Sequence, residues 1–309
     1  MRIAVMGTGG TGGYFGGLLA RAEEEVTFIA RGAHLEAIRK NGLAIKSVLA
    51  GDFTIPAIAT DNLNDIGLVD CVLFCVKAYD NAVAAEQIRP LIGPQTVVLS
   101  VQNGIDNEEQ IGNVVGSEHI VGCASYVSST IESPGVIAQT AGPGKIVLGE
   151  MQGGTSPRTE ALQSALQNSG ITAELHSDIQ TALWQKFLAI CSVNGVTALT
   201  RLPMGDILAC KETLNLMRDT MEEVAAVARA KGANLPEGCV DQSMDFFSSL
   251  EPSMRGSMYY DLAAGRRLEL DVLNGTVVNL GREQGVPTPF NIAIYAALKP
   301  YLNGVPPSA

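Results

Sequence analysis

The first residues with a chemical signature lie near the amino terminus, where five glycines fall within the seven positions 7–13. Gly7, Gly9 and Gly12 satisfy the pattern G-x-G-x-x-G, which here follows an apolar run and opens a helical pattern. In that context the glycines permit a tight turn, close approach of a pyrophosphate and close packing of the helix on the strand. The pattern predicts a dinucleotide site, and a glycine-rich turn without a ligand is the alternative. The predicted cofactor-binding residues of this glycine loop are Gly7, Thr8, Gly9, Gly10, Thr11 and Gly12.

An arginine occupies the position that selects between dinucleotides. At the end of the second predicted strand, nineteen residues after Gly12, the chain carries Arg31. A site for NAD usually has an acid there, which binds the ribose 2′-hydroxyl. A guanidinium instead pairs with a 2′-phosphate through charge-assisted hydrogen bonds. We therefore expect NADP(H) as the cofactor, with an ordinary solvated loop arginine as the alternative.

Two further polar residues follow predicted strands. Lys77 comes after the apolar run 72–76, and Asn103 comes shortly after the run 97–101. In a parallel sheet, ligands bind beyond the carboxyl ends of the strands. Lys77 is thus a candidate for cofactor phosphate or ribose oxygens, and Asn103 offers a donor and an acceptor near the nicotinamide. By position alone, each is equally well explained as a turn residue.

A lysine in the second half of the chain is the candidate acid or base. Lys186 and Asn194 are eight residues apart in a helical pattern, so they share one helix face with Ile190 between them. Apolar neighbours, including Trp184 and Phe187, disfavour the charged form of a lysine, which is how catalytic lysines are tuned. A surface lysine whose stem covers those neighbours is the alternative, and the residues alone do not separate the two.

The elements that would position these residues follow from the apolar pattern. Short apolar runs alternate with helical spacing up to about residue 176, the βαβ rhythm of a parallel sheet covered by helices. A turn is predicted at residues 141–144. Helices are predicted at 14–22 and 158–168. The predicted strands span residues 3–6, 26–30, 72–76, 97–101, 120–124, 136–139, 145–149 and 171–175.

After His176 the pattern becomes helical, with predicted helices at residues 178–199, 213–231, 236–250 and 268–284. The fold class predicted is therefore α/β, with an N-terminal Rossmann dinucleotide-binding domain and a mainly α-helical C-terminal domain. We place the NADP-binding domain at residues 1–176 and the substrate and catalytic domain at residues 177–309.

Composition excludes several classes of function. The 21 basic and 32 acidic residues give a formal charge of −11, which disfavours a nucleic-acid partner. The sequence contains no run of about 18 or more apolar residues, so we expect no membrane-spanning helix. The three histidines lack H-E-x-x-H spacing and the six cysteines lack a C-x-x-C pair, so we expect no metal site. We expect a cytoplasmic protein, and an apolar helical domain is compatible with a homodimer.

Several motifs occur in a characteristic order between residue 2 and about residue 300. They are the glycine loop, Val76-Lys77-Ala78, Asn103-Gly104, Leu183-Trp184-Gln185-Lys186-Phe187 and Leu268-Glu269-Leu270-Asp271-Val272-Leu273-Asn274-Gly275. In this combination the chain resembles the ketopantoate reductases (2-dehydropantoate 2-reductases). The resemblance implies a Rossmann domain followed by a helical domain. It also implies NADPH-dependent reduction of a 2-oxo acid, with 2-dehydropantoate reduced to pantoate in pantothenate biosynthesis.

The resemblance implies roles for individual residues. Lys186 matches the proton donor, which holds the substrate ketone oxygen and protonates it as hydride arrives. Glu269 matches a glutamate that contacts the cofactor and active-site groups and would orient Lys186; without the resemblance, a surface acid on a helix is the favoured interpretation.

Other matched positions concern binding. Asn103 matches an asparagine between nicotinamide and substrate, and Ser257 matches a serine that binds the substrate carboxylate. Asn194 matches a second substrate ligand, while Lys77 and Arg31 match cofactor contacts.

Two positions depart from the pattern of pantoate-forming members. Ile190 stands where an asparagine is common, and Met204 stands in a loop where a polar residue is expected. Both replacements remove hydrogen-bonding groups, so they predict a more apolar pocket and altered substrate discrimination. Two alternatives therefore stay open: a reductase of a different, less polar 2-oxo acid, and a non-catalytic NADP(H)-binding sensor.

Overall fold

The alternating first half of the chain and the helical second half form separate units. The computed structural model describes residues 1–306. Unit 1 comprises Met1–Gln102 and Asp106–Ala182, and unit 2 comprises Asn103–Ile105 and the chain from Leu183 onward. Residues 307–309, the end of the predicted C-terminal domain, lie outside the described part.

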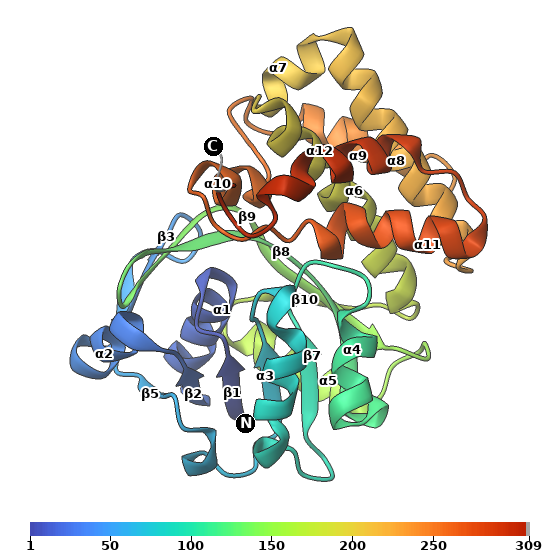
Figure 1. Ribbon diagram of the computed structural model, residues 1–309. Helices are drawn as coiled ribbons and strands as arrows, with labels where there is room; N and C mark the ends of the chain where they lie inside the picture. The colour runs from blue at the N-terminus through green and yellow to red at the C-terminus, as the bar shows by residue number, and fades with distance from the viewer. Residues whose placement is uncertain (307–309) are drawn as a thin grey trace. The chain divides into compact units, whose positions relative to one another are not determined.

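The apolar runs of the first half form a parallel sheet (Figure 1). Its strands β1 (Arg2–Met6), β6 (Cys71–Phe74) and β7 (Val97–Ser100) are almost entirely buried, which explains why they are continuous apolar runs rather than alternating ones. The strand order is the doubly wound order of a Rossmann fold, with every neighbouring pair parallel. From one edge inward the strands are β5 (Ile58–Thr60), β2 (Glu25–Ile29), β1 (Arg2–Met6), β6 (Cys71–Phe74), β7 (Val97–Ser100) and β8 (Ile120–Ser133).

A long antiparallel hairpin extends this sheet. β8 pairs with β9 (Val136–Glu150), and β9 also pairs with β10 (Thr172–Leu175) and β3 (Leu43–Ser47), which in turn pairs with β4 (Phe53–Ile55). The turn predicted at residues 141–144 is wrong, because β9 runs through it. Gly142 and Gly144 adopt φ values of +80° and +61°, so the strand bulges there while its pairing with β8 continues on both sides.

Glycines allow helix α1 (Gly10–Arg21) to lie tightly against strands on two sides. A Cβ on Gly16 would lie 2.8 Å from side-chain atoms of Phe28 and of Val5, and one on Gly17 would lie 3.0 Å from Ile45. Figure 1 shows β3, β8 and β9 curving over this helix. The remaining helices of unit 1 are α2 (Gly32–Asn41), α3 (Asn81–Gln87), α4 (Asn107–Val115) and α5 (Pro157–Asn168).

Unit 2 is built from helices around α6 (Ile179–Thr200), which begins in unit 1 and continues into unit 2. Phe187, Leu188 and Cys191 on α6 are fully buried, as expected for a helix that is apolar on all sides. The other helices are α7 (Met204–Ala209), α8 (Lys211–Ala230), α9 (Cys239–Ser248), α10 (Ser257–Ala263), α11 (Thr276–Gln284) and α12 (Pro289–Leu298).

The predicted fold class is confirmed. Three helices of unit 2 were not predicted. Helices α7 and α10 are too short to show a helical period, and α12 begins at a proline and is largely apolar, so its sequence shows no polar face. The helix predicted at residues 268–284 begins instead with a π-helical turn, Asp271–Gly275, before α11. Within residues 1–306, no helix combines the length and apolar character that crossing a membrane requires.

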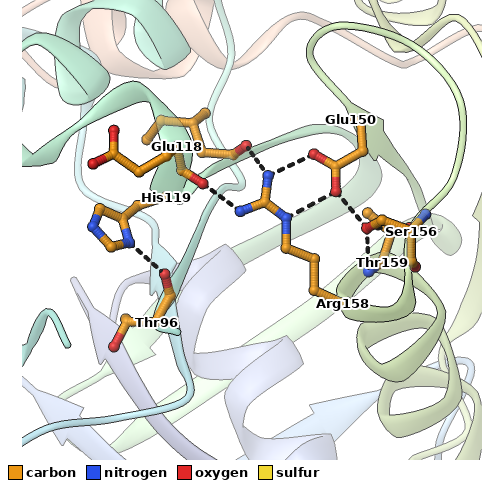
Figure 2. Close-up of polar contacts among 8 residues, drawn as sticks. Thr96, Glu118, His119, Glu150, Ser156, Arg158 and Thr159 are labelled. Atoms are coloured by element: carbon orange, nitrogen blue, oxygen red, sulfur yellow. Dashed lines mark hydrogen bonds and ion pairs between the residues drawn. The ribbon is translucent and has the colours of Figure 1, made fainter. Parts of the chain in front are cut away.

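A carboxylate–guanidinium pair fastens α5 to the β8–β9 hairpin (Figure 2). Arg158 donates from Nε and Nη2 to the two carboxylate oxygens of Glu150, at 2.8 and 2.6 Å. Its Nη1 donates to the carbonyl of Glu118, and Ser156 Oγ donates to the same Glu150 carboxylate. The hydrogen bonds from Arg158 hold the pKa of the Glu150 carboxyl below its ordinary value.

We expect Glu150→Gln to lower the free energy of unfolding by about 2 kcal/mol at pH 7, the size of a part-buried charged hydrogen bond. Because the folded-state pKa is lowered, this contribution is present above the ordinary glutamate pKa of 4.5 and is lost as the pH falls through the folded value. Urea titrations at pH 7 and in increasingly acidic buffers measure it. Glu86→Gln, which removes an exposed pair with Arg89, is the control and should cost less than about 0.5 kcal/mol.

Candidate active site

Two glycines of the glycine loop are required by packing. Gly7 adopts φ +97°, and a Cβ there would lie 2.9 Å from the backbone nitrogen of Val76 at the end of β6. A Cβ on Gly12 would lie 2.3 Å from the carbonyl oxygen of Gly7 and 3.0 Å from Val5. The chain therefore turns sharply after β1, and α1 begins in direct contact with the strand that precedes it.

The remaining glycine of the pattern, Gly9, faces open space. No atom lies within 4 Å of a Cβ built on Gly9, which is the N-cap of α1. No side chain caps this end of the helix and its first turn holds no acid, although the first N–H groups of a helix have no partner within it. Gly9, Gly10 and Thr11 are all partly exposed. This arrangement of donors, with room in front of Gly9, fits the pyrophosphate of a dinucleotide.

Thr8, by contrast, is used by the fold. It is 4% exposed, and both its backbone N–H and its hydroxyl donate to the carbonyl oxygen of Ile29, at 3.1 and 2.9 Å. These bonds join the glycine loop to the end of β2. Any contact of Thr8 with a cofactor would therefore be made through other atoms than its hydroxyl.

Arg31 lies between the end of β2 and the start of α2, and it is exposed. It lines a cleft in unit 1 whose walls also include Gly7, Val76 and Asp61. Asp61 lies 3.5 Å from Arg39, measured between Oδ1 and Nη2. One cation and one acid thus line the cleft beside the glycine loop. Sequence reasoning missed Asp61, because the three-residue strand β5 before it gives almost no signal.

The ends of β6 and β7 are tied together by an amide that the sequence did not single out. Gln102 donates from Nε2 to the carbonyl of Val76 at 2.6 Å and to Asn81 Oδ1 at 2.7 Å. Lys77 is half-buried in the turn after β6. Asn103 is also half-buried and belongs by its contacts to unit 2. The predicted cofactor residues Lys77 and Asn103 therefore fall in different units.

In unit 2, Lys186 and Asn194 lie two turns apart on α6, as predicted. Lys186 is 7% exposed, which is unusual for a lysine. The rings of Trp184 and Phe187 flank it in sequence and pack edge to face in the core, with centroids 5.7 Å apart. Ile190, between Lys186 and Asn194, is half-buried. The lysine is therefore not an ordinary solvated residue of a helix.

Asn194 and Ser257, which are 63 residues apart, are brought together. Asn194 is 3% exposed, and its Oδ1 accepts from Ser257 Oγ at 3.1 Å and from the N–H of Met258 at 2.8 Å. Its Nδ2 donates to the carbonyl of Ile190. Gly256 makes this approach possible, because a Cβ there would lie 2.8 Å from Cα of Asn194. Asn194 thus anchors the start of α10, where Ser257 is exposed.

Glu269 is 6% exposed and precedes the π-helical turn Asp271–Gly275. Such turns often occur at functional sites, because they redirect the residues around them. The turn is held from its exposed side by Asp271, whose Oδ1 accepts from Tyr295 Oη at 2.8 Å and from Lys299 Nζ at 2.6 Å. Glu269 is therefore not the surface helix acid that the residues alone favoured.

Ile190 and Met204, the two residues that depart from the pattern expected of pantoate-forming members, lie in different surroundings. Met204 is fully buried in the hydrophobic core of unit 2, and its N–H donates to the carbonyl of Met254 at 2.9 Å. Its thioether packs in the core, and the effect of Met204 on the polarity of a substrate pocket stays a prediction. Ile190 lies on the same helix as Lys186 and Asn194, and its effect on substrate polarity likewise stays a prediction. Among residues 1–306, no cluster of three or more metal-ligating side chains occurs.

The Rossmann sheet, the open glycine loop and the helical second unit with its buried lysine define an oxidoreductase of the dinucleotide-fold class. Two family models match the chain: "Ketopantoate reductase PanE/ApbA" over residues 3–153 and "Ketopantoate reductase PanE/ApbA C terminal" over residues 178–302. The chain belongs to the ketopantoate reductase family.

Individual relatives agree with this assignment. The 2-dehydropantoate 2-reductase of Mesorhizobium japonicum is 31% identical over 97% of each chain. An uncharacterized oxidoreductase of Bacillus subtilis, YkpB, is 29% identical over 97% of this chain and 99% of its own. The crystal structure of the Geobacter metallireducens 2-dehydropantoate 2-reductase superposes with a TM-score of 0.91 at 33% identity, covering 97% of this chain and 99% of that one.

We expect Gly9→Ala and Gly12→Ala to separate binding from folding. The methyl group of Gly9→Ala enters open space, so the melting temperature should stay unchanged while the affinity for NADPH falls, by about tenfold or more if one close phosphate contact is lost. Gly12→Ala forces backbone atoms apart and should destabilise the fold by about 1–3 kcal/mol or more. Thermal unfolding and fluorescence titration measure both. Equal melting temperatures for the two variants would contradict this account.

Proposed function

We propose that this protein reduces a 2-oxo acid to the 2-hydroxy acid with NADPH, and that 2-dehydropantoate is its leading substrate. The names of the curated relatives support the reaction. The buried Lys186 carries the proposal within this chain, because a reductase needs a proton donor beside the reacting carbonyl. We also propose a reducing cytoplasmic setting, which suits six cysteines that form no disulfide.

The cofactor proposal rests on the glycine loop and Arg31. The open helix end at Gly9 would bind the pyrophosphate through backbone N–H groups. Arg31, in the cleft beside the loop, would pair with a 2′-phosphate. Lys77 would add a contact from the end of β6. The bound cofactor supplies the hydride.

Lys186 supplies the proton in this proposal. Its ammonium would hold the ketone oxygen of the substrate, and a proton would pass from Nζ to that oxygen as the hydride reaches the carbonyl carbon. Negative charge grows on the oxygen during this step, so the ammonium stabilises the transition state more than the ground state. Glu269 would orient Lys186 and contact the cofactor.

The substrate carboxylate would be bound by Ser257. Asn194 holds that serine by a hydrogen bond and anchors the backbone beside it, so its contribution includes positioning as well as any direct contact. Asn103 would lie between the nicotinamide and the substrate. In this proposal Lys186 polarises the substrate carbonyl, Ser257 binds the substrate carboxylate, and Asn103 supplies an amide beside the cofactor.

A less polar 2-oxo acid is the second candidate substrate, and Ile190 favours it. The side chain of Ile190 offers no hydrogen bond at a position beside both Lys186 and Asn194 on α6. A substrate hydroxyl that meets an apolar wall loses its partner, which discriminates against it.

We expect Lys186→Ala to lower kcat by a factor of about 100–10,000, the usual contribution of a general acid, while NADPH still binds. The assay follows NADPH absorbance with 2-dehydropantoate and with a panel of more apolar 2-oxo acids. Lys211→Ala, at an exposed position on α8, is the control and should keep full activity.

The panel also separates the candidate functions. Faster turnover of an apolar 2-oxo acid than of 2-dehydropantoate would favour the second substrate, and no oxidation of NADPH with any acid would favour a binding protein without activity. Unchanged turnover in Lys186→Ala would remove this lysine from the mechanism.

We expect Arg31→Ala to weaken NADPH binding by about tenfold or more, since a charge-assisted pair with the 2′-phosphate is lost. The affinity for NADH should change little, because NADH lacks that phosphate. Calorimetric titration of both nucleotides measures the ratio, and Arg89→Ala, which removes an exposed arginine of unit 1, is the control. A parallel loss of affinity for both nucleotides would show that Arg31 does not select between them.

A further inference from the structure

A histidine on α2 joins the glycine loop to the turn of the β8–β9 hairpin. His34 Nε2 lies 2.8 Å from the carbonyl oxygen of Thr8, and the backbone N–H of Gly135 donates to His34 Nδ1 at 3.0 Å. Because a backbone N–H can only donate, Nδ1 must be the unprotonated nitrogen. The ring proton therefore lies on Nε2, which donates to Thr8. His34 is neutral in this arrangement, and burial lowers its pKa, which favours the neutral form.

The hairpin that His34 contacts also packs on the first turns of α1. A Cβ on Gly10 would lie 2.1 Å from the carbonyl oxygen of Ser129 in β8, and one on Gly13 would lie 2.6 Å from Ile137 in β9. Gly135, in the turn between these strands, adopts φ +80°. The hairpin is thus a firm support, and His34 is a hydrogen-bonded link from it to the glycine loop.

The bond to Thr8 has a consequence for the next residue. The carbonyl of Thr8 and the N–H of Gly9 belong to one planar trans peptide, so they point in opposite directions. Holding the carbonyl on one side therefore sets the direction of the Gly9 N–H on the other. The N–H and hydroxyl of Thr8 are bound to Ile29, so the residue that precedes this peptide is held in place as well.

We propose that His34 is a positioning residue for the cofactor: through its Nε2–H bond to Thr8, it orients the Thr8–Gly9 peptide so that the Gly9 N–H is ready to bind the pyrophosphate. The inference rests on the proposed NADPH binding. A preorganised donor loses less entropy on binding than a mobile one, so His34 raises affinity without touching the ligand.

Two substitutions test the bonds of His34 separately. The amide of glutamine extends about as far as Nε2 and can donate to Thr8, whereas the amide of asparagine extends about as far as Nδ1 and can accept from Gly135. Each variant keeps one bond and loses the other, so both should lose similar thermal stability. Only His34→Asn should lose affinity for NADPH, by about tenfold, the effect of one oriented hydrogen bond. His34→Gln should stay within about threefold of the wild type.

The kinetics provide a second measurement. KM for NADPH should rise in His34→Asn while kcat stays unchanged, since Lys186 lies in unit 2 and is untouched. His119→Asn alters another half-buried histidine of unit 1, bonded to the carbonyl of Thr96, and should leave the NADPH affinity unchanged (Figure 2). Equal losses of affinity in His34→Asn and His34→Gln would show a structural role only and overturn the inference. Wild-type affinity in both variants would overturn it too. A wild-type protein that fails to bind NADPH would refute the proposed function itself.

Discussion

The close approach of the backbone at the start of α1 is the constraint on which unit 1 depends. The carbonyl of Gly7 and the Cα of Gly12 come so near that no side chain fits between them. This contact sets the helix directly beyond β1, with its first N–H groups beside the sheet edge where the strands end. The β8–β9 hairpin presses on the same turn from another side, at Gly10. These contacts fix the position of the first turn of α1, so its N–H groups are oriented donors for an anion.

In unit 2, the most unusual feature is a buried lysine on an apolar helix. Lys186 lies on a helix that is buried along most of its length, yet a lysine is rarely so enclosed without a function. The polar residues of the bundle near the start of α10 are held by one another, as Asn194 holds Ser257. The π-helical turn after Glu269 is a local departure from regular geometry in the same unit. Irregular turns and buried polar groups of this kind often occur at functional sites.

Membership of the ketopantoate reductase family narrows the reaction more than the substrate. Discrimination among 2-oxo acids depends on individual hydrogen bonds to substrate substituents, whereas hydride and proton transfer depend on the cofactor and one acid. In the resemblance that the sequence shows, Lys186, Ser257 and Glu269 match the expected positions and Ile190 departs from them. The fold can therefore be shared with relatives at about 30% identity while the preferred acid differs.

Local patterns in the sequence determined the alternation of strands and helices, the glycine loop, Arg31 at the end of β2 and the pairing of Lys186 with Asn194 on one helix face. These are short-range features, since strand runs, glycine spacing and helical period are each complete within about 20 residues. The tertiary structure decided the rest. It continued β9 through a predicted turn, buried Met204 in the core, placed Ser257 on Asn194 and brought His34 between Thr8 and Gly135. Each of those outcomes depends on a contact between residues far apart in the chain, and no local pattern of residue types encodes such a contact.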